Sequence, residues 1–252
     1  MKRILLSVLV ISLFSFLTAC GGKTKDSSSK ANKPEVSKDT AFAQYIDAAD
    51  AKGKTTMTLI GHASVKIVTK DGKVIYIDPF YDGDYSQPAD LVIVTHSRDD
   101  HNKVDLVKLK DGGKTIGSPD YMKDGKYIKI EANGIQIEGT PAADKAHRVG
   151  DYAGVLLTID GMTIYHASDT LNIAEMKNLT AKNIDYALLP VDGLLTMTMQ
   201  DATDCANLIN AKHAIPIHME MNNDPYDKEY AKKFNAKNRM LVEYGKTIEL
   251  VK

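Results

Sequence analysis

The chain has 252 residues, of which 43% are hydrophobic, with 32 basic and 33 acidic side chains, seven histidines and two cysteines. This length and apolar content fit one large globular domain or two small ones. The near-neutral charge argues against nucleic-acid binding, which needs a basic excess, and two cysteines are too few for a disulfide scaffold.

The first twenty residues have the pattern of an export signal. Two basic residues precede an apolar run from Ile4 to Leu17, which is too short to cross a bilayer as a helix and fits a secretory signal. The run ends in Leu-Thr-Ala-Cys, and Cys20 is followed by two glycines, which resembles the lipobox of bacterial lipoproteins. The resemblance implies removal of residues 1–19, lipidation of Cys20, and an exported protein anchored to a bacterial membrane in the cell envelope. The alternative is an uncleaved anchor in which this cysteine is incidental.

A polar segment separates this signal from the folded part of the chain. Residues 20–42 are rich in Ser, Lys, Asp and Gly, so they cannot bury enough apolar surface to offset chain entropy. We expect a flexible tether here and a single domain over residues 43–252. Removal of the leader leaves 30 basic against 33 acidic side chains, a formal charge of −3.

The domain is predicted to begin with strands that are joined by tight turns. Asp-Gly pairs at 71–72 and 160–161 stand between β-branched runs, as type I′ hairpin turns require. Residues 91–94 are almost purely apolar, which is typical of a strand covered on both faces. The expected strands are 57–60, 65–68, 74–77, 91–94, 155–159, 162–165, 187–189 and 214–217.

Helices are expected between some of these strands. Thr198 and Asp201 form a Thr-x-x-Asp helix start, and the apolar positions that follow place Cys205 on the buried face as a structural thiol. Weaker helical patterns cover 102–109 and 226–234. Hairpins mixed with strand–helix alternation predict a layered α/β or α+β sandwich.

The histidines carry the chemistry of the sequence. His62, His96, His166 and His218 follow predicted strands directly or nearly so, and strand ends are where layered folds gather ligands. The loop 95–101, Thr-His-Ser-Arg-Asp-Asp-His, brings two imidazoles and carboxylates into one short segment. Such a loop can aim several ligands at one divalent metal ion.

This loop resembles the T-H-x-H-x-D-H signature of the metallo-β-lactamase superfamily, and further landmarks of its uncharacterised metal-dependent hydrolase branch occur in order before and after it. They are Gly61-His62-Ala63-Ser64, Ile77-Asp78-Pro79-Phe80, Thr140-Pro141-Ala142 followed by His147, Tyr165-His166-Ala167-Ser168-Asp169-Thr170, Leu188-Leu189-Pro190-Val191 and Pro216-Ile217-His218-Met219. The resemblance implies a four-layer αββα sandwich of the α/β (α+β) class with one or two metal ions in a cleft.

The resemblance also implies two sets of ligands, one of which is incomplete. One set uses His96, position 98 and His147, but position 98 is Arg98, and a guanidinium offers only hydrogen-bond donors. Ser168 is a second departure, since the family has glycine there. We therefore expect one retained metal at the other set, which is Asp100, His101, Asp169 and His218.

These ligands predict a hydrolase. The expected cofactor is one or two divalent ions, zinc before iron or manganese, which lower the pKa of bound water toward about 7 and so provide hydroxide. Asp100 or Asp169 would orient the nucleophile and take its proton. Arg98 would take the place of the lost metal, hold an anionic substrate group, or help to stabilise an oxyanion.

Three histidines keep two interpretations each. His96 and His147 are either metal ligands or, when freed from ligation, proton shuttles or substrate contacts. His62 either lines the substrate cleft or makes a hydrogen bond in the core.

Two classes of function remain open. The first is a lipid-anchored, metal-dependent hydrolase that acts on a small ester, lactone, amide or phosphodiester. The second is a catalytically degenerate family member that binds a ligand or an envelope partner, with Arg98 and Ser168 as marks of lost catalysis. Export and the charge of −3 argue against a nucleic-acid substrate.

Overall fold

The computed structural model describes residues 41–219 and 224–252. The predicted leader, Cys20 and the tether up to residue 40 lie outside these ranges. Ala41 is already buried in an apolar cluster, and Phe42 forms a β-bridge with Leu241. None of the helices in the described part of the chain is long and apolar enough to cross a bilayer.

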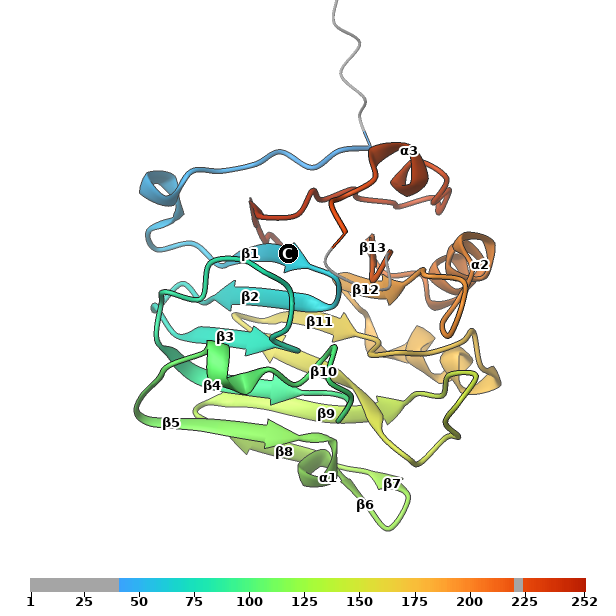
Figure 1. The fold of residues 1–252 in the computed structure, drawn as a ribbon, viewed down its shortest axis with the longest axis horizontal. Helices are drawn as coiled ribbons and strands as arrows, with labels where there is room; N and C mark the ends of the chain where they lie inside the picture. The colour runs from blue at the N-terminus through green and yellow to red at the C-terminus, as the bar shows by residue number, and fades with distance from the viewer. Residues whose placement is uncertain (1–40, 220–223) are drawn as a thin grey trace, which may run out of the picture. The chain divides into compact units, whose positions relative to one another are not determined.

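The first sheet has six strands in the order β14-β1-β2-β3-β4-β5 (Figure 1). Their bounds are β1 Thr56–Gly61, β2 Ser64–Val68, β3 Val74–Ile77, β4 Ala89–Val94, β5 Leu109–Gly117 and β14 Lys246–Glu249. Strands β14, β1, β2 and β3 pair antiparallel, whereas β3, β4 and β5 pair parallel. The carboxyl ends of β1, β3 and β4 therefore lie at one edge of this sheet.

The second sheet also has six strands, in the order β13-β12-β11-β10-β9-β8. Their bounds are β8 Lys129–Ala132, β9 Ile135–Pro141, β10 Ala153–Ile159, β11 Met162–His166, β12 Tyr186–Pro190 and β13 His213–Ile217. Only β11, β12 and β13 pair parallel, and β10 runs against both of its neighbours. The carboxyl ends of β9, β11, β12 and β13 thus share one edge.

The largest core cluster lies between the two sheets, because alternate residues of each strand point inward. In β12, Tyr186 and Leu188 belong to this inner core, whereas Ala187 and Leu189 belong to the cluster outside the second sheet. This arrangement explains why the central strands read as continuous apolar runs.

Helices cover the outer face of the second sheet, and a thinner layer covers the first. The outer cluster of the second sheet includes residues of α2 Met199–Ile209, of the 3-10 helix η3 Ala174–Lys182 and of α3 Lys228–Ala231. Over the first sheet, the loop near Tyr81 and Tyr85 and the 3-10 helix η2 Val104–Leu106 provide the packing. The remaining short elements are η1 Ala48–Ala51, α1 Ser118–Tyr121, β6 Met122–Lys123 and β7 Lys126–Tyr127. The predicted layered sandwich is confirmed.

All eight predicted strands are present, and the predicted helix after Thr198 is α2. The Thr198 hydroxyl accepts from the Asp201 amide, so the capping box forms, and Cys205 is fully buried. The turn at Asp160-Gly161 has positive φ at both residues, as predicted, whereas in the turn at 71–72 only the glycine does.

The helix expected over 102–109 is wrong. Only Val104–Leu106 forms a 3-10 turn, because Val104 and Val107 pack on the first sheet and the chain then enters β5 at Leu109. The helix expected over 226–234 is reduced to α3. Strands β5, β8, β9 and β14 were missed, as was the short pair β6 and β7. β5, β8 and β14 lie at sheet edges, and β5 has little apolar alternation to signal a strand, whereas β9 lies between β8 and β10 inside the second sheet.

Candidate metal centre

The predicted site residues and their neighbours lie near the carboxyl ends of strands from both sheets, and four residues in this region have left-handed backbone. His62 follows β1, Asp78 follows β3, Ser168 follows β11 and His218 follows β13, with φ of 54°, 46°, 62° and 52°. This conformation costs a residue other than glycine about 1 kcal/mol or more. The amide of His218 donates to the carbonyl of His62 at 2.8 Å, so the two sheets are joined directly at this point.

The turn at Ser168 explains one departure from the family pattern. Glycine is the residue that adopts positive φ without steric cost. Ser168 adopts it nevertheless, with its hydroxyl 2.7 Å from that of Thr95, in the signature loop of the other sheet. Ser168 thus adds a contact between the two sheets and does not disturb Asp169 beside it.

Asp78 orients His101, the last residue of the signature loop. Its Oδ2 lies 2.8 Å from Nδ1 of His101, and its two oxygens also accept from the amide and the hydroxyl of Thr95 at 2.7 and 2.6 Å. Asp78 and His101 are both fully buried. A carboxylate at Nδ1 fixes the orientation of a histidine and leaves Nε2 as the ligand nitrogen. Asp78, which was not among the predicted site residues, therefore belongs to the centre.

Two further histidines have a carboxylate at the same ring position. Nδ1 of His218 lies 3.2 Å from Asp192 Oδ2, and Nδ1 of His147 lies 3.0 Å from both oxygens of Asp144. Sequence reasoning missed Asp192 and Asp144. The available signal was weak: Asp192 comes two residues after β12, and Asp144 three residues after β9.

Asp169 lies between the remaining nitrogens. Its Oδ1 is 3.1 Å from Nε2 of His101 and 3.2 Å from Nε2 of His218, and its Oδ2 is 3.6 Å from Nδ1 of His96. Burial would raise the pKa of Asp169, but His101 and His218 outweigh it and hold the pKa well below its usual value. The carboxylate is therefore ionised. It faces both halves of the centre, one with His101 and His218 and the other with His96.

Several buried polar atoms here have no hydrogen bond of acceptable geometry within the described residues. They are Nδ1 of His96, Nε2 of His101, both oxygens of Asp169, both ring nitrogens of His218 and Oδ2 of Asp192. Buried polar atoms are normally satisfied, since desolvation without a partner is costly. Lone pairs that converge at 3.1–3.6 Å without hydrogen-bond geometry are what the ligand shell of a metal ion provides. The residues fit a bound cation.

The charges of this half also favour a cation. Burial lowers the pKa of His101, but the carboxylates of Asp169 and Asp78 outweigh burial and raise it well above the usual value. In physical terms, the site stabilises a positive charge at this imidazole, either as a proton or as a metal ion on Nε2.

Asp100 is the most exposed carboxylate among the predicted ligands. Its side chain is 18% exposed, and its Oδ2 lies 3.5 Å from Nε2 of His62 and 3.9 Å from Nε2 of His218. Burial would raise its pKa, but His62, His101 and Arg98 hold it below the usual value. One metal ion can contact a ligand atom from each of His62, Asp100, His101 and His218, because these atoms lie within 4.8 Å of one another. The structure therefore brings His62 close to the predicted ligands Asp100, His101 and His218.

The other half contains His96, His147 and Arg98. The His96 ring stacks on Tyr152 at 4.1 Å and meets His147 edge-on at 4.9 Å. The Tyr152 hydroxyl donates to the carbonyl of Asp169 at 2.5 Å, and burial raises the pKa of this tyrosine well above its usual value. Arg98 Nε lies 3.5 Å from Oδ1 of Asp100, so the guanidinium is directed at the metal centre.

His166, adjacent to this cluster, has a structural role. Its Nε2 lies 2.9 Å from the carbonyl of Ala63, and its Nδ1 accepts from the amide of Ser168 at 3.3 Å. Burial lowers its pKa, so the ring is neutral. It supports the turn that carries Asp169.

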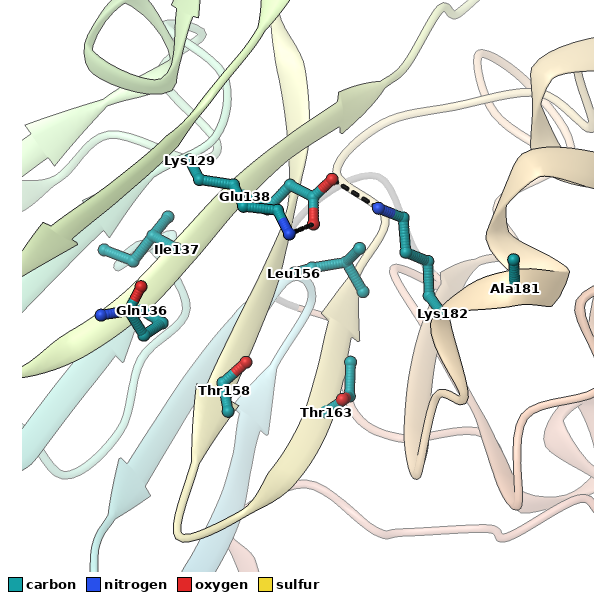
Figure 2. A pocket seen from close by; sticks show the side chains of 9 residues that line it. All are labelled: Lys129, Gln136, Ile137, Glu138, Leu156, Thr158, Thr163, Ala181 and Lys182. Atoms are coloured by element: carbon teal, nitrogen blue, oxygen red, sulfur yellow. Dashed lines mark hydrogen bonds and ion pairs between the residues drawn. The ribbon is translucent and has the colours of Figure 1, made fainter.

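A hollow of about 410 Å³ lies away from the histidines, against strands β8 to β11 and η3 (Figure 2). Lys129 and Lys182 reach over it, and both pair with Glu138, at 3.5 and 2.5 Å. Its lining has no histidine or cysteine. Among the described residues, the groups of side chains that could hold a metal ion all belong to the cluster near the strand ends.

Comparison with known proteins identifies the family. Residues 56–218 match the model of the beta-lactamase superfamily domain, and this range includes every predicted metal ligand. The chain belongs to the metallo-β-lactamase superfamily. The UPF0173 metal-dependent hydrolase of Pyrococcus furiosus is 30% identical over 227 residues, which cover 77% of this chain and 99% of that protein. A UPF0173 metal-dependent hydrolase of Lysinibacillus sphaericus is 32% identical over 63% of this chain and 82% of its own length.

Solved structures agree with this assignment. A protein of Parabacteroides distasonis has a TM-score of 0.61 at 27% identity, covering 75% of this chain and 93% of its own. A metallo hydrolase of Ignicoccus hospitalis has a TM-score of 0.58 at 26% identity, covering 77% and 97%. The predicted metallo-β-lactamase fold is confirmed, and the protein is a metal-dependent hydrolase of this superfamily.

Proposed function

We propose that the protein hydrolyses a small substrate with one tightly held metal ion in the intact half of the centre. The ligands of this ion are Asp100, His101, Asp169 and His218. The observation that supports this proposal is the set of buried, unsatisfied lone pairs on His101, Asp169 and His218. These ligands also favour the enzyme over a degenerate binding protein, because an inactive centre has no need to keep such costly atoms.

Zinc is the metal we favour. Three or four nitrogen and oxygen ligands with an open position are typical of catalytic zinc, while iron and manganese also accept imidazole and carboxylate. When bound, the ion supplies a Lewis acid and a water of lowered pKa.

The protein residues around the ion divide the remaining work. Asp100 is ionised, is more exposed than Asp169, and is the carboxylate that we expect to orient the attacking water and take its proton on Oδ2. Asp169 is 1% exposed and is suited to hold ligands in place. Arg98, with its side chain 34% exposed, can present its guanidinium to an anionic group of the substrate or to a developing oxyanion.

The substrate class that this arrangement supports is an ester, lactone, amide or phosphodiester. A cation beside the ion favours a substrate that carries negative charge near the reacting bond. We therefore expect anionic esters and phosphodiesters to be turned over better than neutral esters of the same size.

Metal analysis tests the proposal most directly. We would express the chain from Gly21, which keeps Ala41 and Phe42 in contact with the domain, and measure zinc, iron and manganese per chain. About one equivalent is expected, and His218→Ala should lose it. The absence of metal above trace level, even after reconstitution, would contradict the proposal.

The location of the enzyme is a separate proposal. We infer from the leader and from Cys20 that the mature protein is lipid-anchored at the cell envelope, with the tether holding the hydrolase away from the membrane. Detergent-phase partitioning of the full chain should be lost in Cys20→Ala, while metal content stays the same. Equal partitioning of both proteins would contradict the anchor.

A further inference from the structure

The half of the centre beside Arg98 contains a carboxylate that no motif predicts. We propose that His96, Asp144 and His147 form a second, weaker metal position, in which Asp144 supplies the ligand that position 98 has lost. This goes beyond the single hydrolytic ion proposed above, and rests on that proposal only in taking the neighbouring position as already filled.

The first support is the distance between the ligand atoms. One ligand atom from each of His96, Asp144 and His147 can be chosen so that all three lie within 4.8 Å of one another, so one ion can contact all three. Both oxygens of Asp144 are 3.0 Å from Nδ1 of His147. Two ligands of one zinc ion, each about 2.0–2.2 Å from it, stand roughly 3 to 3.5 Å apart.

The second support is an unsatisfied buried nitrogen. His96 is 2% exposed, and its Nδ1 has no hydrogen bond of acceptable geometry within the described residues. The ring is held by stacking on Tyr152 at 4.1 Å, so it cannot easily turn to find another partner. A metal ion would satisfy this nitrogen where it stands.

The third support is the way Asp144 is held. Its side chain is fully buried, and its Oδ1 accepts from the amides of Ala146 and His147 at 2.6 Å each. The carboxylate is therefore positioned by the local turn before any metal binds. Its Oδ2 lies 3.0 Å from Nδ1 of His147, and the Tyr152 hydroxyl also interacts with this carboxylate. A carboxylate offers about four lone-pair sites, so these contacts still leave one for a cation.

Charge explains why this position should be the weaker one. Arg98 brings a positive charge to the centre, and a cation there must overcome that repulsion. The negative charge of Asp144 offsets it, and Oδ2 of Asp169, 3.6 Å from Nδ1 of His96, faces the same side. The two positions would then share Asp169, with the tight ion on Oδ1 and the weak ion near Oδ2.

The experiment is a titration of metal-free protein, expressed from Gly21, with cobalt(II) and then with zinc, read by absorption and calorimetry. Wild type should take up one tight equivalent and a second weaker one. In Asp144→Asn the side-chain oxygen still accepts from the two backbone amides of the turn, but the charge is gone. We expect the second equivalent to weaken by more than the roughly 10–100-fold that loss of an outer partner costs, while the first is unchanged.

The matched control is Asp151→Asn. Asp151 lies in the same loop, is exposed and accepts from the amide of Arg148, so this change removes a nearby charge without touching the cluster. Its second equivalent should bind as in wild type.

The outcomes separate this inference from the proposed function. A single tight equivalent in wild type, with no second even in large excess of metal, would overturn the inference and leave the hydrolytic ion in place. A second equivalent that Asp144→Asn weakens less than tenfold would overturn the role of Asp144. The absence of the first, tight equivalent would instead contradict the proposed function.

Discussion

The two halves of the metal centre are held by the same strand ends but differ in how completely their ligands are prepared. In one half, His101 and His218 each have a carboxylate at Nδ1 and direct Nε2 at Asp169. In the other half, His147 has Asp144 in the same place, but the neighbouring ligand position is Arg98. One substitution thus separates a prepared site from an altered one.

The difference shows that a metal site is specified as much by its outer partners as by its ligands. Asp78 and Asp192 fix the ring orientation of the two histidines of the intact half, which reduces the cost of ordering them when metal binds. In the altered half, Asp144 lies at the same ring position of His147, 3.0 Å from Nδ1. The predictions below test this comparison, from the largest expected effect to the smallest.

Removal of a ligand from the intact half should have the largest effect. In His101→Ala the tight ion loses a buried nitrogen and Asp78 loses its partner. We expect metal content to fall to trace level and hydrolysis to drop by more than about a hundredfold, beyond the cost of an outer partner. Metal analysis and initial rates measure this effect. Near-normal metal content in this variant would show that the tight ion lies elsewhere.

Loss of an outer partner should have an intermediate effect. In Asp192→Asn the His218 ring keeps a neighbour at Nδ1 but loses the charge that orients it, so affinity for the tight ion should fall by roughly 10–100-fold. Competition with a chelator measures this change. The exposed Asp124→Asn is the control, and equal affinities in the two variants would exclude a role for Asp192.

Restoring the ligand at position 98 should change the altered half alone. Arg98→His adds a nitrogen donor and removes a repelling charge, so the metal content of the protein as purified should rise from about one toward two. Arg98→Gln removes the charge without adding a comparable ligand, and should stay near one. Unchanged content in Arg98→His would mean that position 98 does not face the ligands as the family pattern implies.

The thiol of Cys205, remote from both halves of the centre, should be unreactive while the protein is folded. Burial raises the pKa of the Cys205 thiol to about 12, so the folded protein expressed from Gly21 should not react with a thiol reagent at pH 8. After unfolding, one thiol should react. The unfolded thiol ionises at lower pH than the folded one, so this group lowers stability only as pH rises above its ordinary pKa near 9. Rapid reaction of the folded protein would show that the α2 face is open.

Much of the fold was predictable because its signals are local. Apolar runs bounded by turns identified eight strands, seven of them inside the two sheets and β13 at an edge, and the Thr198–Asp201 pair identified the start of α2. Strands β5, β8, β9 and β14 were missed. Three of them lie at sheet edges, where the mostly exposed β5 shows little of the periodic burial that sequence patterns reveal, but β9 lies between β8 and β10. The region 102–109 was predicted incorrectly because spaced apolar residues also suit a short turn packed on a sheet.

The sequence by itself determined the kind of centre: the signature loop 95–101, the later Asp169 and His218, and the arginine at position 98 are all visible in order along the chain. Only the tertiary structure decided which side chains complete it. Asp78 is 23 residues from His101 and Asp192 is 26 from His218, and each pair meets because separate strands end at one edge. Such pairs carry no local signal, since their contact depends on the folding of whole sheets.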